Sequence, residues 1–261
     1  MWRRYLSTGV ILLILLSTKS ACANTLEISP TLYLFSHQEF DQNNTLLNED
    51  EGEIPGIKLS YADVTERDSI KFNASFFNGS IDNTGETLVG TPNVTETEAQ
   101  LFKLGISYAQ HELTVFPGLL FAGLHYWNWD RDILTRNGIQ GIHEEYAWYE
   151  TELGLKFISD SSYWLELSAM YNFKPETRLF LPSSEVKFTL QSRPGYRIRA
   201  GKTWTTSESM TTSISLFSEY WEFGESDIVF TTDFFGSSAF LTIPNSETFN
   251  SGLEFSFILN F

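Results

Sequence analysis

The chain ends in Ser251-Gly252-Leu253-Glu254-Phe255-Ser256-Phe257-Ile258-Leu259-Asn260-Phe261. With a period of two residues, one face of this segment is wholly apolar and carries Leu253, Phe255, Phe257, Leu259 and Phe261. The other face carries Gly, Glu, Ser and Asn, with Ile258 as its one apolar member. This alternation predicts a β-strand with one apolar and one polar side. A water-soluble protein would cover such a strand or interrupt its apolar face with charges.

Residues 1–23 have the three parts of an export signal. Two arginines give a positive start, a short apolar run follows, and Ala21-Cys22-Ala23 forms a cleavage site before Asn24. The apolar run is too short to cross a bilayer as a helix. The alternative is a lipoprotein signal lipidated at Cys22, which the lysine three residues earlier disfavours. We therefore expect residues 1–23 to be a cleaved signal peptide and residues 24–261 to be one exported domain.

The charge of the exported part limits the partners that it can bind. The whole chain of 261 residues has 17 basic and 33 acidic residues and a net charge of −16. Cleavage removes Arg3, Arg4 and Lys19 but no acid, so the net charge falls to −19. Such a charge argues against nucleic acid or an anionic surface as a partner. The single cysteine is also removed, which leaves no disulfide framework.

Apolar alternation recurs along the rest of the chain, which is 15% aromatic and contains 22 Phe and 11 Tyr. Alternating segments of about ten residues separated by polar stretches are typical of a transmembrane β-barrel. The sheet must close because lipid offers no partner to a free strand edge. We predict an all-β, antiparallel up-and-down barrel of ten strands, at residues 26–40, 55–65, 69–78, 98–109, 113–129, 143–158, 162–173, 186–204, 210–224 and 251–261. Eight or twelve strands are the alternatives if 113–129 or 186–204 is misassigned.

The predicted connections alternate between short and long. Outer-membrane barrels have short periplasmic turns and long extracellular loops, and an even strand number brings both termini to the periplasm. The signal, the alternating segments and the C-terminal strand together resemble bacterial outer-membrane β-barrel proteins, without identifying a subfamily. The resemblance implies a Gram-negative outer membrane, a lipid surround, and a signal for the barrel-assembly machinery at Phe255, Phe257, Leu259 and Phe261. We expect a monomer without cofactor or metal.

Charged residues predicted to face the lumen are the strongest candidate site. They belong to the sixth to ninth predicted strands and are Glu150, Glu152, Glu166, Lys187, Arg193, Arg197, Arg199 and Glu219. In a small barrel such charges must be paired or solvated. The favoured interpretation is an ion-pair network that fills the lumen. The alternative is a narrow polar conduit, with these residues as its constriction.

Enzymatic sites are incomplete in this sequence. Asp130-Arg131-Asp132 resembles the acidic pair of the omptin proteases, but no histidine follows an aspartate by two residues. Ser36 and His37 are adjacent, as a lipid hydrolase could use them, but they point to opposite faces of a strand. His125 and His143 flank a predicted loop, and two imidazoles alone make a weak metal site. We therefore predict a non-enzymatic protein with a structural, surface-binding or narrow-pore role, with a passive channel and a rim enzyme as alternatives.

The predicted extracellular loops are long and acidic. The last of them, residues 225–250, differs because it is rich in apolar residues such as Phe230 and Phe240. An apolar stretch of this kind predicts a plug, an extra hairpin or a contact site.

Overall fold

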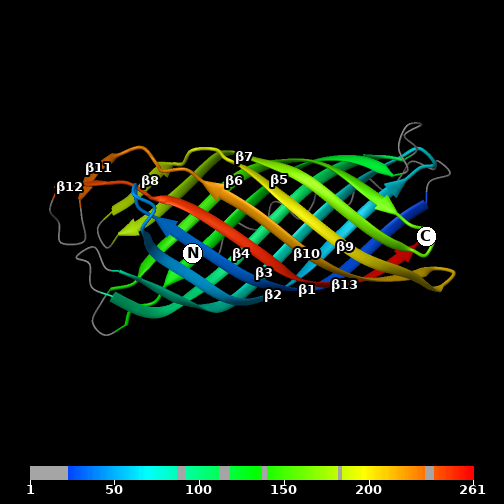
Figure 1. Cartoon of the computed structure of the whole chain (residues 1–261), viewed down its shortest axis with the longest axis horizontal. Helices are drawn as coiled ribbons and strands as arrows, with labels where there is room; N and C mark the ends of the chain where they lie inside the picture. Colours follow the sequence, from blue (N-terminus) through cyan, green and yellow to red (C-terminus); the bar gives the residue numbers. More distant parts are fainter. Residues whose placement is uncertain (1–22, 87–91, 112–117, 137–139, 182–183, 233–237) are drawn as a thin grey trace, which may run out of the picture.

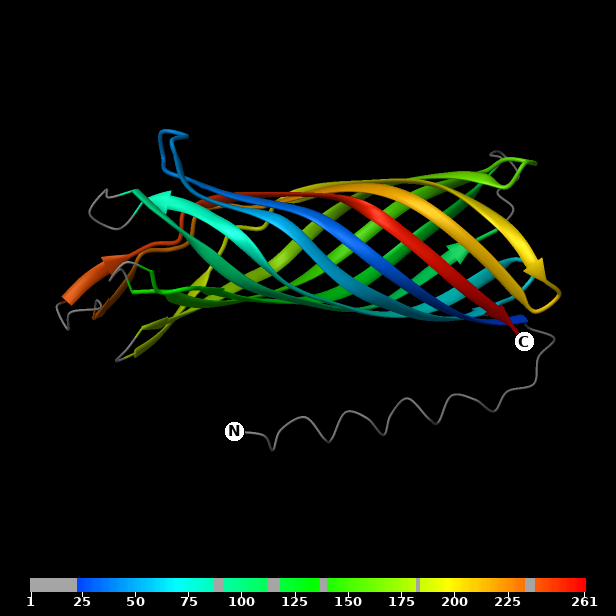
Figure 2. The same cartoon turned by 90° about the horizontal axis from the view of Figure 1, so that it is seen from below.

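The computed structural model describes residues 23–86, 92–111, 118–136, 140–181, 184–232 and 238–261. Ten antiparallel strands form one closed barrel whose axis runs horizontally in Figures 1 and 2. In order around the wall they are β1 (Ala23–Phe40), β2 (Leu46–Val64), β3 (Asp68–Glu86), β4 (Pro92–Gln110), β5 (Leu119–Ile133), β6 (Ile142–Ile158), β7 (Tyr163–Leu181), β9 (Pro194–Ser207), β10 (Met210–Phe223) and β13 (Asn245–Asn260). Each strand pairs with its neighbours along the chain, and β13 returns to β1. The prediction of a ten-stranded up-and-down barrel is confirmed.

Three short strands lie outside this ring. β8 (Ser184–Thr189) pairs with the end of β7, whereas β11 (Val229–Thr232) and β12 (Ser238–Leu241) form a separate two-stranded sheet. Both features lie at the end of the barrel opposite the C-terminus (Figure 1). The predicted loop 225–250 thus contains an extra hairpin, which was one of its three predicted states, but its last six residues were wrongly assigned because β13 already begins at Asn245. In the described part of the chain, no helix is long and apolar enough to cross a membrane.

The C-terminal strand closes the barrel. β13 pairs with β1 on one side, where Leu259 lies opposite Leu26, and with β10 on the other, where Leu259 lies opposite Met210. Its apolar side chains point out of the barrel, and Glu254 points in with 3% exposure. The predicted alternation is confirmed, and the apparent free edge is paired on both sides. Recognition by the assembly machinery stays a prediction.

An apolar band surrounds the barrel and ends short of the end that carries β11 and β12. Exposed aliphatic side chains such as Leu59, Leu104 and Leu216 cover the outer face. Toward the end that carries β11 and β12, stacked aromatic pairs such as Tyr196 and Tyr220 border this band. Further along the strands, acidic residues such as Glu96 are exposed on the outside. Charged side chains do not face lipid, so the strands continue beyond the apolar band. We call this part the extracellular extension, after the prediction that the long connections are extracellular.

The predicted loop boundaries were wrong in this extension. Residues 41–54 and 79–97 were expected to be loops, yet β2 already begins at Leu46 and β3 runs to Glu86. Above the band the outer face meets water, so a strand there is polar outside and buried inside. Such a segment lacks outward-facing apolar residues, so a search for lipid-facing strands assigns it as a loop. Much of the expected acidic loop is therefore acidic strand.

The eighth predicted strand, 186–204, was also wrong, because it is two strands. Among the described residues β8 pairs only with the end of β7, and the chain joins the wall again at Pro194 as β9. Val186 and Phe188 were expected to face lipid, but they are 4% and 1% exposed and pack inside the extension. The fifth strand spans Leu119–Ile133, and its predicted start at 113 lies outside the described residues. The predicted signal segment does so too, apart from Ala23.

Candidate functional site

Arg197 is the centre of an ion-pair network in the lumen. It projects inward from β9, and its Nη1 lies 2.7 Å from Oε1 of Glu152, while its Nε lies 2.7 Å from Oε2 of Glu219. Glu150 lies 3.7 Å from Nη2 of Arg197 and 3.1 Å from Nζ of Lys103. Acidic groups from β6 and β10 are thereby bound to basic groups from β4 and β9. Such cross-wall pairing fixes the relative positions of strands that are far apart in the sequence.

A second network lies nearer the end of the barrel that carries the C-terminus. Arg199 donates to Glu254 and lies 3.5 Å from Glu166, while Nζ of Lys58 lies 2.7 Å from Oε2 of Glu254. These groups line a polar cavity of about 300 Å³. Lys58 and Lys103 were not among the residues predicted for the cluster, although both alternate correctly with lipid-facing neighbours. Their partners come from distant strands, so only the register of the closed barrel identifies the pairs.

Six of the eight predicted cluster residues lie in the lumen: Glu150, Glu152, Glu166, Arg197, Arg199 and Glu219. The inward orientation predicted for Lys187 and Arg193 was wrong. Lys187 is 52% exposed and pairs with Glu176 at 2.7 Å. Arg193 is exposed and donates to Gln191 at 3.3 Å. Lys187 lies in β8, outside the ring of wall strands, and Arg193 lies just before β9 begins, so the alternation of the wall strands applies to neither residue.

An aromatic core fills the lumen between this network and the extracellular end. Trp127, Trp129, Trp148 and Trp221 are each at most 1% exposed. The rings of Trp127 and Trp148 stack with centroids 5.4 Å apart, and Trp221 lies 5.7 Å from Trp127. The other large members of the core include Tyr33, Phe35, Phe77, Leu101, Tyr146, Phe188 and Phe223. The core spans the lumen, because its side chains come from β1, β3, β4, β5, β6, β8 and β10.

Arg131 organises a third network above the aromatic core. Its Nε lies 2.7 Å from Asp50, and its Nη1 lies 2.6 Å from Glu39 and 2.8 Å from Glu144. Arg131 and Asp50 are both fully buried. Burial by itself would raise the pKa of Glu39, but the charge of Arg131 and contacts with His37 hold that pKa well below its usual range. Burial, offset only in part by Arg131, raises the pKa of Glu144.

The predicted enzymatic fragments do not assemble into a site. Asp130 and Asp132 flank Arg131 on β5 and therefore point to the outer face of the barrel, away from the lumen. His37 is fully buried, where its Nδ1 lies 2.8 Å from Oγ1 of Thr248, and Ser36 lies on the opposite face. His125 and His143 also lie apart, because His125 pairs in register with Glu150 and His143 with Asp132.

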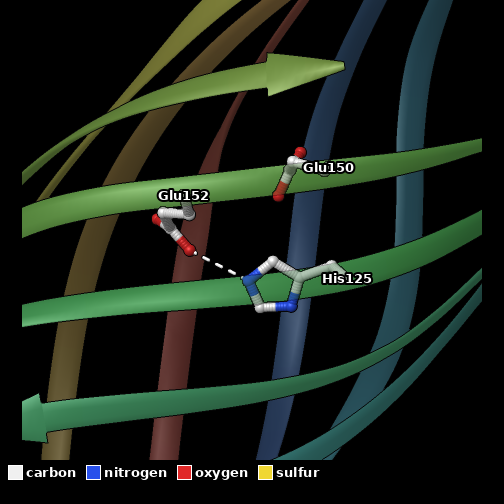
Figure 3. Close-up of side chains that lie close together, drawn as sticks. All are labelled: His125, Glu150 and Glu152. Carbon is white, nitrogen blue, oxygen red and sulfur yellow. Dashed lines mark hydrogen bonds and ion pairs between the residues drawn. The ribbon is translucent and has the colours of Figure 1, made fainter. Parts of the chain in front are cut away.

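His125, Glu150 and Glu152 form a compact group in the lumen (Figure 3). Nε2 of His125 lies 3.1 Å from Oε2 of Glu152. The spacing of these donor atoms suits a metal ion, but Lys103 and Arg197 already neutralise the two carboxylates. An added cation would sit beside two fixed positive charges, which repel it. The group is therefore part of the ion-pair network.

Comparisons with known proteins agree with this fold. No family model matches the sequence, and no curated protein sequence matches it. The structure is similar to that of the outer-membrane protease OmpT from Escherichia coli, with 10% identity over 94% of this chain and 99% of that one and a TM-score of 0.56. An outer-membrane channel from Pseudomonas putida F1 also matches, with 10% identity over 94% of this chain and 97% of that one and a TM-score of 0.45. At such identities the likeness is one of fold. The chain is an outer-membrane type of β-barrel, which supports an outer-membrane location.

Proposed function

We propose that this chain is a non-enzymatic, non-conducting outer-membrane protein that acts through its extracellular extension, in a structural or surface-binding role. The aromatic core carries this proposal. Trp127 and Trp129 are fully buried and Trp148 and Trp221 are 1% exposed, so the core excludes water from the middle of the lumen. A solute pore needs a continuous polar or hydrated path. The core interrupts any such path between the Arg197 and Arg131 networks.

The extracellular extension is the part of the barrel that lipid does not cover. The hairpin of β11 and β12 projects from it (Figure 2). Phe230 and Phe240 on this hairpin are 63% and 74% exposed, and Ile228, just before β11, is 72% exposed. Exposed apolar groups of this kind mark contact surfaces more often than they serve stability. A rim enzyme is disfavoured because Asp130 and Asp132 point outward from the wall instead of into a groove.

A swelling assay on proteoliposomes tests the closed lumen. We expect vesicles that contain the folded protein to swell no faster in an isotonic solution of a small sugar or amino acid than protein-free vesicles, because the aromatic core blocks diffusion. Light scattering measures the swelling, and the shift of the folded band on unboiled gels verifies insertion. Vesicles with a general porin supply the positive control. Swelling that rises with the amount of folded protein would refute the proposal.

A further inference from the structure

The outer face of the β5–β6 pair carries metal-ligating side chains that the lumenal networks leave unused. Strand pairing sets Asp130 opposite Glu145 and Asp132 opposite His143. The donor atoms of Asp130, His143 and Glu145 all lie within 4.8 Å of one another, and Nδ1 of His143 lies 3.5 Å from Oδ1 of Asp130. The side chains of Asp130, His143 and Glu145 are 39%, 33% and 35% exposed, so an ion can reach them from solvent.

We propose that Asp130, His143 and Glu145 bind a divalent transition-metal ion of the zinc type on the outer surface of the extracellular extension. One imidazole nitrogen with two carboxylate oxygens suits Zn²⁺ and its neighbours in the first transition row. Ca²⁺ and Mg²⁺ instead favour sites built from oxygen alone. Two ligands about 2.1 Å from an ion are at most about 4.2 Å apart, so side-chain movements of less than an ångström close the site.

The strands that present these ligands are held from the inside. Residues alternate between the faces of a strand, so Arg131 and Glu144 lie between the ligands and point inward. They are joined at 2.8 Å across the same strand pair. On the outside, the ring of His143 packs against Phe180 of β7 with centroids 4.7 Å apart. The backbone and the imidazole are thus positioned before an ion binds.

The local charge also favours a cation. Asp130, Asp132 and Glu145 share this face, and among the described residues the arginine or lysine paired with them is Arg178, 3.8 Å from Glu145. Arg178 is 49% exposed and lies equally far from Glu185. The surroundings of His125 in the lumen differ, because its acidic neighbours are paired with buried Lys103 and Arg197. A metal ion at the outer site would supply positive charge to carboxylates that the protein itself does not neutralise there.

The site lies in water rather than in lipid. On β5, Asp130 comes four residues after Tyr126. On the antiparallel β6, Glu145 comes four residues before Tyr149, so both ligands lie on the same side of the tyrosines. The rings of Tyr126 and Tyr149 are 5.5 Å apart on the outer face at the border of the apolar band. Metal binding at this height is independent of whether the lumen conducts, so its test and that of the closed lumen can fail separately.

Titration calorimetry with Zn²⁺ on the folded full chain in detergent, stripped of metal beforehand, tests the site. We expect one ion per chain, and an affinity at least about tenfold weaker in each of His143→Gln, Asp130→Asn and Glu145→Gln. His111→Gln is the matched control, because His111 lies at the periplasmic end and contacts Ser69 at 3.2 Å. It should leave the affinity unchanged. Gel mobility before boiling verifies that every variant is folded.

Electron paramagnetic resonance with Cu²⁺ as the probe gives a second readout. The wild type should show coupling to one imidazole nitrogen, and His143→Gln should lose it. The proposal is overturned if the three substitutions change Zn²⁺ affinity no more than His111→Gln does. It is also overturned if Ca²⁺ binds as tightly as Zn²⁺, or if the nitrogen coupling persists without His143.

Discussion

Replacing Arg131 with methionine is expected to destabilise the folded barrel by about 3–5 kcal/mol at pH 8, the usual cost of removing one partner from a buried ion pair. The substitution leaves Glu39, Asp50 and Glu144 buried together without their shared cation. Asp50 keeps hydrogen bonds from Asn83 at 2.7 Å and Thr97 at 2.8 Å, which offset only part of the loss. Urea unfolding in lipid vesicles, followed by tryptophan fluorescence, measures the change.

The effect of this substitution should depend on pH in a defined direction. In the wild type the pKa of Glu39 is lowered, so its contribution to stability is present above the unfolded value of about 4.3 and is lost at lower pH. In the variant, Glu39 and Glu144 keep the burial that raises their pKa and lose the charge of Arg131 that lowers it, so folding takes up protons and becomes costlier as the pH rises through the raised values. The difference between wild type and variant should therefore widen from pH 5 to pH 8.

Arg178→Met is the control for Arg131→Met. Arg178 is 49% exposed and its two acidic neighbours are each 3.8 Å away. Exposed pairs of this kind contribute about 0–1 kcal/mol. Equal losses of stability for the two variants, or a difference that narrows as the pH rises, would contradict a buried ion-pair network around Arg131.

Arg197→Ala is expected to cost about 3–5 kcal/mol, whereas Arg193→Ala should change the free energy of unfolding by no more than about 0.5 kcal/mol. Arg197 holds Glu152 and Glu219 inside the lumen, each at 2.7 Å. Arg193 is exposed and contacts Gln191. The same urea titration compares the two variants. Similar losses for both would mean that Arg193 belongs to the lumenal cluster, as the sequence alone had predicted.

The lipid-facing part of the fold could be predicted from the sequence because a single rule governs it. Wherever the outside is lipid, apolar residues alternate with polar ones, as from Leu253 to Phe261 in β13. That rule located all ten strands of the wall. It failed above the membrane, where the surroundings of the barrel change from lipid to water. There Val186 and Phe188 point inward and Lys187 outward, which inverts the pattern without changing its period.

The ion-pair networks inside the barrel depend on the register between strands more than on the local sequence pattern. Arg131 meets Asp50, which is 81 residues earlier in the chain, and Glu39, which is 92 residues earlier. The motif Asp130-Arg131-Asp132 drew attention to its two acids, yet the arginine between them is the residue that faces the lumen. The aromatic core was missed for the same reason. Its tryptophans lie on strands that alternate correctly, but residues 113–129 are apolar on both faces and left the register undetermined.

The outer group of Asp130, His143 and Glu145 lay beyond the reach of sequence analysis. Its three members are contiguous only after β5 and β6 pair, and its histidine had been considered together with His125. The two histidines point to different faces of the wall, one to the lumen and one to solvent. Strand pairing therefore keeps His125 and His143 apart and brings Asp130, His143 and Glu145 together.

Single-channel recording in planar lipid bilayers tests the closed lumen most directly. The wild type should give no discrete current steps at moderate voltage. Trp127→Ala combined with Trp148→Ala removes two stacked rings from the core and, where unboiled gels show it folded, should give current steps that verify insertion. A wild-type protein that inserts and carries a steady, ohmic current equal to that of the double variant would contradict the account.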